Sequence, residues 1–201
     1  KRRGVNVIAR TAVDRVDTGA NLGATVHYRQ GDSDEDRTAY GEVVLAAIGR
    51  VPNTDADWFR SSGLKLDERG YVTVDGYGRT NLDGVWALGD ITPGHALAHR
   101  AFEQGITIAE KIAGADPKPV IDDTVPQVVF SFPEAASVGL TLDQAKARED
   151  VVEPKETAYP MLSNARMLMS GEGGSMTVVS GAFANNPDMQ VVLGVHIVSP
   201  I

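Results

Sequence analysis

The stretch Thr-Asn-Leu-Asp-Gly-Val-Trp-Ala-Leu-Gly-Asp at residues 80–90 says most about the fold. A turn leads into the apolar run 85–88, which we expect to be a strand that ends at Gly89. Asp90 follows directly. In a parallel α/β sheet, ligands bind beyond the carboxyl ends of strands and beside helix amino termini. We therefore predict that Asp90 accepts hydrogen bonds from a polyhydroxylated ligand, although aspartate is also a common and compatible helix N-cap.

The region after Asp90 has the period of an amphipathic helix. Small and apolar residues recur at three- and four-residue spacing, which predicts one buried helical face. The members of that face are Ala98, Ala101, Phe102, Gly105, Ala109, Ile112 and Ala113. Gly114 is placed to end the helix, and Pro117 lies just beyond it. The predicted helix would therefore present its positive amino terminus near Asp90.

Composition limits the function classes. The 201 residues allow one large domain or pieces of two, and 42% hydrophobic residues are ordinary for a globular protein. A formal net charge of −8 argues against binding nucleic acid. No apolar run reaches the length needed to span a membrane. The chain has no cysteine, which excludes disulfides and thiolate metal sites and fits a cytoplasmic location.

The two halves of the chain have different patterns. In the first half we expect a short helix at 57–63 and strands at 5–8, 12–16, 24–28, 42–48 and 71–74. The run 42–48 is apolar nearly throughout, which is typical of a strand buried on both faces. The second half favours an α+β arrangement. We expect a helix at 142–148 with Thr141 as its N-cap and strands at 125–132, 157–160, 175–179 and 191–198.

Three polar side chains of the predicted helix share one face at four-residue spacing: His95, His99 and Glu103. Two such histidines can bind zinc, but the metalloprotease pattern requires glutamate where Ala96 stands. We therefore predict no metal site. For His99 a packed, hydrogen-bonded histidine is the alternative to a role in ligand binding.

Several segments resemble the pyridine nucleotide–disulfide oxidoreductases. Residues 80–90 resemble the second flavin-binding motif of that family, which implies that Gly89 and Asp90 bind FAD, with Asp90 on the ribityl hydroxyls. Residues 95–105, which contain Leu-Ala-His, resemble most the dihydrolipoamide dehydrogenase branch. That resemblance places Leu97, Ala98 and His99 against the isoalloxazine of FAD. Residues 46–53, Ala-Ala-Ile-Gly-Arg-Val-Pro-Asn, resemble the strand end that lies beside NAD, which gives the candidate NAD contacts Ala47, Ile48, Gly49 and Arg50.

The last third of the chain resembles the interface domain of the same family. Residues 125–139, 159–166 and 193–198 match it in order. The resemblance implies a homodimer formed through residues 121–201. The implied fold class is α/β nucleotide-binding, Rossmann-like segments followed by an α+β dimerisation domain, both incomplete. Residues 1–50 would close the NAD(P)-binding domain, residues 51–120 would be the second segment of the FAD-binding domain, and residues 121–201 would be the truncated interface domain.

Other parts of the family pattern do not occur in this sequence. No Gly-x-Gly-x-x-Gly loop precedes Ala46, and neither the cysteine pair nor the carboxyl-terminal His-Pro and Glu segment is present. We therefore expect a piece of a longer protein, with no catalytic residue of its own and no dithiol oxidase activity alone.

The resemblance implies a specific activity for the longer protein. It would be a flavin-dependent dihydrolipoamide dehydrogenase that passes electrons from a dihydrolipoyl dithiol through an enzyme disulfide and FAD to NAD+. Components of 2-oxo acid dehydrogenase complexes are then possible partners. The alternatives are another FAD/NAD(P)H disulfide or quinone reductase of the family, or a non-catalytic dimerisation module. NAD and NADP stay undistinguished, because the strand that reads the ribose is not in the sequence.

Overall fold

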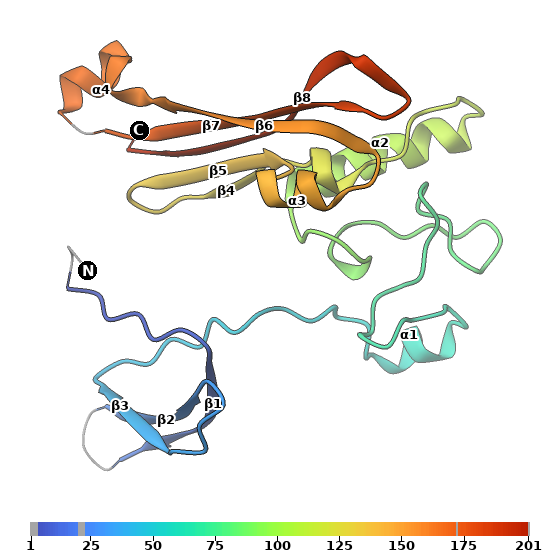
Figure 1. The fold of residues 1–201 in the computed structure, drawn as a ribbon. Coiled ribbons are helices and arrows are strands. Elements are labelled where there is room, and N and C mark those ends of the chain that lie inside the picture. Colours follow the sequence, from blue (N-terminus) through green and yellow to red (C-terminus); the bar gives the residue numbers. More distant parts are fainter. Residues whose placement is uncertain (1–3, 20–22, 172, 201) are drawn as a thin grey trace. The chain divides into compact units, whose positions relative to one another are not determined.

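The chain folds into two compact units. The computed structural model describes residues 4–19, 23–171 and 173–200, and the units comprise residues 1–50 and residues 51–201. The elements of each unit can be followed in Figure 1 by their labels and colours.

The first unit contains an antiparallel sheet of three strands among its described residues. Its strands follow the chain in the order β1 (Thr11–Thr18), β2 (Ala24–Gln30) and β3 (Arg37–Gly41). The strands predicted at 12–16 and 24–28 are confirmed, whereas 5–8 is not a strand and β3 was not predicted. Across the β1–β2 ladder Arg29 donates hydrogen bonds to both carboxylate oxygens of Asp14, at 2.9 and 2.6 Å.

The strand predicted at 42–48 does not form. The segment has no regular structure, and its side chains are exposed, as shown by Val43 at 87% and Ile48 at 93%. The strand predicted at 85–88 is reduced to one β-bridge between Trp86 and Arg79, and that at 71–74 to one between Val72 and Leu66. Every strand pair among the described residues is antiparallel. An apolar segment forms a strand of a parallel sheet only when it pairs with a neighbouring parallel strand. The described residues contain no such partner for these segments.

The second unit begins with a segment poor in regular structure. It contains α1 (Asp57–Ser61), the short 3-10 helix η1 (Gly89–Ile91) and the long helix α2 (Ala98–Ile112). A small cluster of buried side chains, Phe59, Val72 and Ala87, holds this segment together. Since Val72 is fully buried and its N–H donates to the Ile91 carbonyl at 2.8 Å, the cluster is also tied to η1.

Helix α2 confirms the predicted span but not the predicted face. Gly114 follows it with a φ of +85°, and the N–H groups of Gly114 and Ala115 close the helix on the carbonyls of Lys111 and Glu110. However, Phe102 is 73% exposed and Ile112 60% exposed. Of the predicted face only Ala101 and Gly105 are half-buried; the other buried or half-buried residues of the helix are Arg100, Gln104, Thr107, Ile108 and Lys111. Among the described residues no sheet covers the apolar face of α2. The neighbouring face, which has both polar and apolar side chains, is buried instead.

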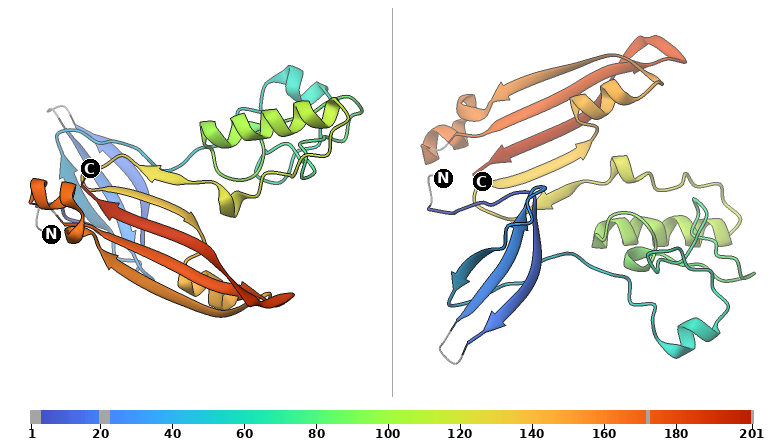
Figure 2. Two further views of the ribbon diagram at one scale, coloured as in Figure 1. Left: turned by 90° about the horizontal axis from the view of Figure 1, so that it is seen from above. Right: turned by 60° about the horizontal axis from the view of Figure 1, so that its bottom comes forward.

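A five-stranded antiparallel sheet makes up most of the rest, in the strand order β4-β5-β8-β7-β6 among the described residues. The strands are β4 (Gln127–Val129), β5 (Glu134–Gly139), β6 (Val151–Pro160), β7 (Ser175–Phe183) and β8 (Asn186–Ser199). The strands predicted at 125–132, 157–160, 175–179 and 191–198 are confirmed within these longer or shorter elements, and β5 was not predicted. Figure 2 shows the long β6, β7 and β8 running side by side.

Short helices accompany the sheet. They are η2 (Asp122–Thr124), α3 (Leu142–Ala147), η3 (Met161–Ser163) and α4 (Ala165–Ser170). Thr141 caps α3 as predicted, in a reciprocal capping box with Gln144. Helix α3 packs beside β6, and α4 lies towards the opposite end of the sheet in both views. The core under α3 consists of Leu140, Ala145, Val151, Val179 and Leu193.

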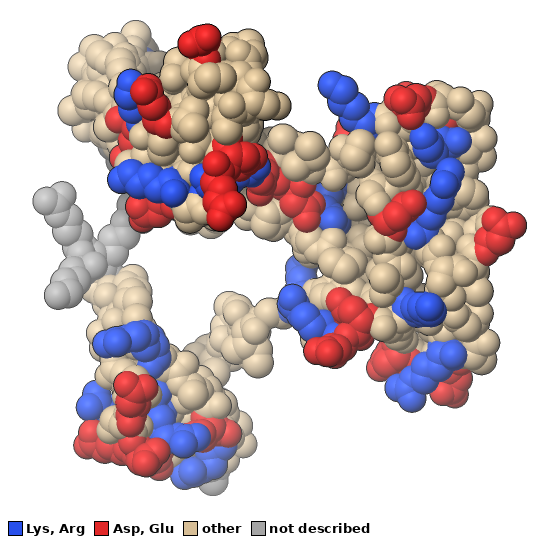
Figure 3. Space-filling view, turned by 45° about the vertical axis from the view of Figure 1, so that its right-hand side comes forward, with Lys and Arg blue, Asp and Glu red and all other residues tan. Residues whose placement is uncertain are grey.

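The surface carries charges of both signs as well as exposed apolar side chains, such as Phe102 at 73% and Phe130 at 85%. On the face drawn in Figure 3, acidic and basic side chains are interspersed rather than gathered by sign. Among residues 4–19, 23–171 and 173–200, no helix has the length and apolar character needed to cross a membrane.

Candidate functional site

The turn that presents Asp90 differs from the predicted strand end. Residues 89–91 form the 3-10 helix η1, and Gly89 has a φ of +74°, a conformation that favours glycine. Gly89 is buried, whereas the Asp90 side chain is exposed. Asp90 therefore stands on a tight turn at the surface, and its carboxylate is open to a ligand.

Two side chains hold this turn, and the sequence patterns did not single out either. The Gly89 N–H donates to Oε1 of Gln104 in α2 at 2.9 Å. The Thr92 hydroxyl donates to the Gly89 carbonyl at 2.8 Å, and Thr92 is only 1% exposed. Gln104 lies on the same helical face as Arg100, Thr107 and Lys111. This second, polar stripe of α2 was the signal in the sequence that could have revealed Gln104.

The amino terminus of α2 suits a polar or anionic group. Its N-cap is Leu97, no side chain caps it, and its first turn contains no acidic residue. The hypothesis that Asp90 caps this helix is therefore wrong. The first N–H groups of an α-helix have no partner within the helix and carry partial positive charge. Leu97 is half-buried and the Ala98 and His99 side chains are exposed, so all three candidate flavin contacts lie at this open end.

These features fit a flavin cofactor. A glycine at positive φ, an exposed carboxylate and an uncapped helix terminus occur on one connected piece of backbone. η1 and α2 are in direct contact, and a Cβ built on Gly89 would lie 3.4 Å from the Ala101 Cβ. The carboxylate can accept hydrogen bonds from sugar-type hydroxyls, while the helix terminus favours developing negative charge.

The histidines near this site are engaged by other parts of the chain. His99 Nε2 lies 2.7 Å from the Pro126 carbonyl, and His95 Nε2 lies 3.1 Å from the side-chain amide nitrogen of Gln127. Within the described residues, no three His, Asp or Glu side chains gather as a metal site would require. The His99 side chain is thus hydrogen-bonded, as the alternative expected, but it is exposed rather than packed, and its backbone lies at the helix terminus.

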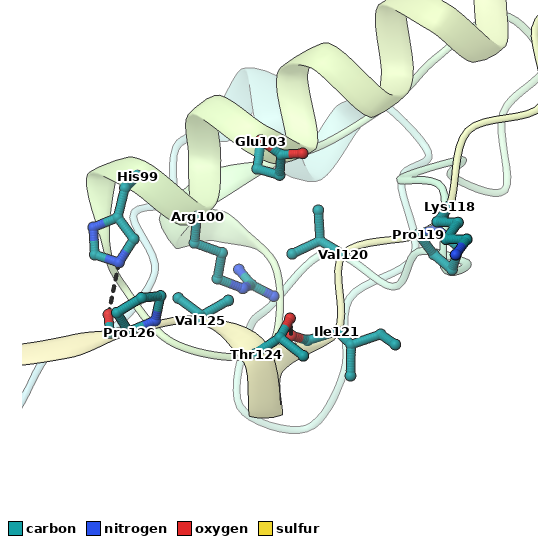
Figure 4. A pocket seen from close by; sticks show the side chains of 10 residues that line it. All are labelled: His99, Arg100, Glu103, Lys118, Pro119, Val120, Ile121, Thr124, Val125 and Pro126. Atoms are coloured by element: carbon teal, nitrogen blue, oxygen red, sulfur yellow. Dashed lines mark hydrogen bonds between the residues drawn. The ribbon is translucent and has the colours of Figure 1, made fainter. Parts of the chain in front are cut away.

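A cavity of about 480 Å³ lies between α2 and the segment that leads to β4. Figure 4 shows His99, Arg100 and Glu103 on the helix side and Val120, Thr124 and Pro126 on the opposite side. Arg100 is 6% exposed; its Nε donates to Asp122 and its Nη2 to the Pro93 carbonyl, both at 2.6 Å. Since Asp122 belongs to η2 and its side chain is 40% exposed, this half-buried ion pair connects α2 to the start of the sheet region.

The candidate NAD contacts lie outside any helix or strand. Ala47, Ile48, Gly49 and Arg50 are all exposed and lie in an irregular segment, with Gly49 at a φ of +124°. Nothing lies within 4 Å of a Cβ built on Gly49. The open backbone at Gly49 leaves room for a ligand, but the structure does not gather these four residues into a site.

The described residues combine an antiparallel five-stranded sheet with a helix and a glycine turn that leave a carboxylate exposed. Sequence comparison assigns the chain to a family. Residues 1–105 match the pyridine nucleotide-disulphide oxidoreductase model and residues 125–201 match the dimerisation domain of the same family. The chain belongs to this family. The expected fold class, nucleotide-binding segments followed by a dimerisation domain, is thereby confirmed.

Several curated proteins align with nearly the whole chain. The dihydrolipoyl dehydrogenase of Cupriavidus necator is 38% identical over 98% of this chain, and that of Geobacillus stearothermophilus is 37% identical over all of it. In each case the chain spans 40% of the relative. Among solved structures, LpdA from Mycobacterium tuberculosis has a TM-score of 0.83 and 30% identity over 99% of this chain and 41% of that one. The flavoprotein disulfide reductase RclA from Escherichia coli has a TM-score of 0.75 at 24% identity, over 94% of this chain and 40% of RclA, which shows the shared fold.

Proposed function

We propose that this chain is part of an FAD-dependent dihydrolipoamide dehydrogenase. The longer protein would oxidise a dihydrolipoyl dithiol through an enzyme disulfide and FAD and reduce NAD+. The observation that carries the proposal is the Gly89–Asp90 turn fixed beside the uncapped terminus of α2. The identity of 37 and 38% to two dihydrolipoyl dehydrogenases supports this branch of the family.

The residues of the chain bind and orient rather than react. Asp90 accepts hydrogen bonds from the ribityl hydroxyls, with Gly89 allowing close approach of the backbone. Leu97, Ala98 and His99 would place the helix terminus beside the isoalloxazine, where its partial positive charge would favour negative charge. FAD, when bound, supplies the carrier that takes electrons from the thiols and gives them to the nicotinamide. Ala47, Ile48, Gly49 and Arg50 would lie beside NAD.

The proposal also assigns the domains and the partners. Residues 1–50 would close the NAD(P)-binding domain, residues 51–120 would complete the FAD-binding domain, and residues 121–201 would form a homodimer. The components of a 2-oxo acid dehydrogenase complex would be the partners that deliver the dithiol, in the cytoplasm. The match of residues 125–201 to the dimerisation domain supports the dimer.

This proposal is tested by measuring the enzymatic turnover of the full-length protein, purified from its source organism. We expect NAD+ reduction driven by dihydrolipoamide, with yellow flavin in the purified protein. Asp90→Ala should abolish most of this activity through loss of FAD, whereas Asp83→Ala, an exposed aspartate of the same stretch, should not. Turnover of another disulfide or of a quinone, with none of dihydrolipoamide, would overturn the assigned substrate, and a protein without flavin would overturn the cofactor.

A further inference from the structure

The buried backbone N–H of Gly89 depends on a side chain for its hydrogen bond. Buried backbone N–H groups are nearly always paired, usually within a helix or a ladder. Residues 85–88 form no ladder beyond the single bridge at Trp86, so the chain before Gly89 provides no such partner. The Gln104 amide oxygen, which is the only acceptor that this side chain offers, lies 2.9 Å from the Gly89 nitrogen.

The other groups of the turn are held as well. Thr92 donates its hydroxyl and its N–H to the Gly89 carbonyl at 2.8 and 3.0 Å. The Ile91 carbonyl accepts from the Val72 N–H at 2.8 Å, in the middle of a buried cluster. The backbone on both sides of Asp90 is thereby fixed, while the Asp90 carboxylate is exposed and available to a ligand.

Gln104 connects this turn to the helix that carries the other flavin contacts. It stands six residues after Ala98, the first residue of α2, which corresponds to about 9 Å along the helix axis. Because an α-helix of 15 residues is stiff over this distance, a hydrogen bond at Gln104 fixes the turn relative to the helix terminus. Sites held in this way lose less freedom when the ligand binds.

We propose that Gln104 is a positioning residue for the flavin site, and that its side-chain oxygen sets the position of Asp90 relative to the amino terminus of α2. The inference rests on the proposed FAD site but adds a residue that itself touches no cofactor. This role requires a side chain at position 104 that is long enough to place a hydrogen-bond acceptor next to the Gly89 N–H. Glutamate provides one, whereas methionine has similar size and no comparable acceptor.

FAD dissociation constants of the protein as its source organism produces it test the role of Gln104. We expect Gln104→Met to raise the dissociation constant about fivefold, in line with loss of one ordinary hydrogen bond. Gln104→Glu should restore it to within about twofold, because the carboxylate keeps the bond to Gly89. Glu110→Met, which makes a matched change at an exposed position of the same helix, should leave FAD binding unchanged.

A double-mutant cycle separates positioning from general loss of stability. If Gln104 acts through Asp90, then Gln104→Met should have no further effect on FAD binding in an Asp90→Ala background. A wild-type dissociation constant in Gln104→Met, or equal effects in both backgrounds, would overturn the role of Gln104 while leaving the flavin site intact. A wild-type protein that binds no FAD would instead overturn the proposed function.

Discussion

The backbone N–H and carbonyl groups find their hydrogen-bond partners differently in residues 51–120 and in residues 121–201. The later region forms long antiparallel ladders over its own core, with Val179 and Ala182 fully buried. The earlier region relies on side chains: Asp67 accepts from the N–H groups of Arg69 and Tyr71, and Asp75 from those of Tyr77 and Arg79, at 2.8–2.9 Å. The comparison shows that a region without partner strands can keep a defined backbone when short polar side chains replace the ladder.

The sheet region should be the most sensitive to backbone crowding. Gly139 of β5 faces Gly194 of β8, has a φ of +78°, and a Cβ on it would lie 2.2 Å from the Leu193 carbonyl oxygen. We expect Gly139→Ala to lower the free energy of unfolding by about 3 kcal/mol or more, since conformational strain and a clash with backbone add. Urea denaturation measures this change.

Gly114 provides the matched control for that substitution. Its φ is +85°, but nothing lies within 4 Å of a Cβ built on it. Gly114→Ala should therefore cost only the conformational strain, about 1 kcal/mol. Equal losses in the two variants would show that the close approach of β5 and β8 carries no energetic weight.

Truncation of apolar side chains should separate the two regions next. Val179→Ala removes methyl groups from the core of the sheet and should cost about 2 kcal/mol. Phe102→Ala removes a larger side chain from α2, but that side chain is 73% exposed and should cost less than about 0.5 kcal/mol in the 201-residue polypeptide. Thermal unfolding of both variants measures the two losses of stability. A larger loss in Phe102→Ala than in Val179→Ala would contradict the exposure of Phe102 on α2.

The side-chain acceptors of the earlier region should matter at a smaller scale. Asp75→Ala leaves the N–H groups of Tyr77 and Arg79 without an acceptor and should cost about 1 kcal/mol. Asp75→Asn keeps an amide oxygen at the same place and should lose much less. Hydrogen exchange at the two amides measures the effect locally, and unchanged protection in Asp75→Ala would show that the turn does not need the side chain.

The weakest expected effect concerns acid stability next to the sheet. Hydrogen bonds from Arg148, at 2.8 and 2.7 Å, lower the pKa of Asp150. A lowered carboxyl pKa contributes stability above its ordinary value, and that contribution is lost as pH falls through the lowered pKa. Asp150→Asn should therefore flatten the acid end of the stability curve slightly, with no change near neutral pH beyond a constant offset. An unaltered acid slope in unfolding titrations would contradict a bound Asp150 carboxylate.

The sequence predicted the elements that depend on local signals. The span of α2, its end at Gly114 and the cap at Thr141 were all predictable because periodicity and capping chemistry act within a few residues. The buried strand predicted at 42–48 does not form, and the one predicted at 85–88 is reduced to a single bridge, because an apolar run does not show whether a partner strand is present. The motif predicted Asp90 as a ligand contact, and the structure places its side chain at the surface. Gln104 was not predicted: the polar stripe of α2 indicates its helical face, but its partner Gly89 lies fifteen residues away and is identified only in the folded chain.

Whether the carboxylate of Asp90 holds a flavin is measured by the FAD dissociation constant of the Asp90→Ala variant. In the protein as its source organism produces it, we expect that constant to rise at least about tenfold over wild type, since hydrogen bonds to a charged acceptor are lost. An unchanged dissociation constant in a folded variant would contradict this role of Asp90.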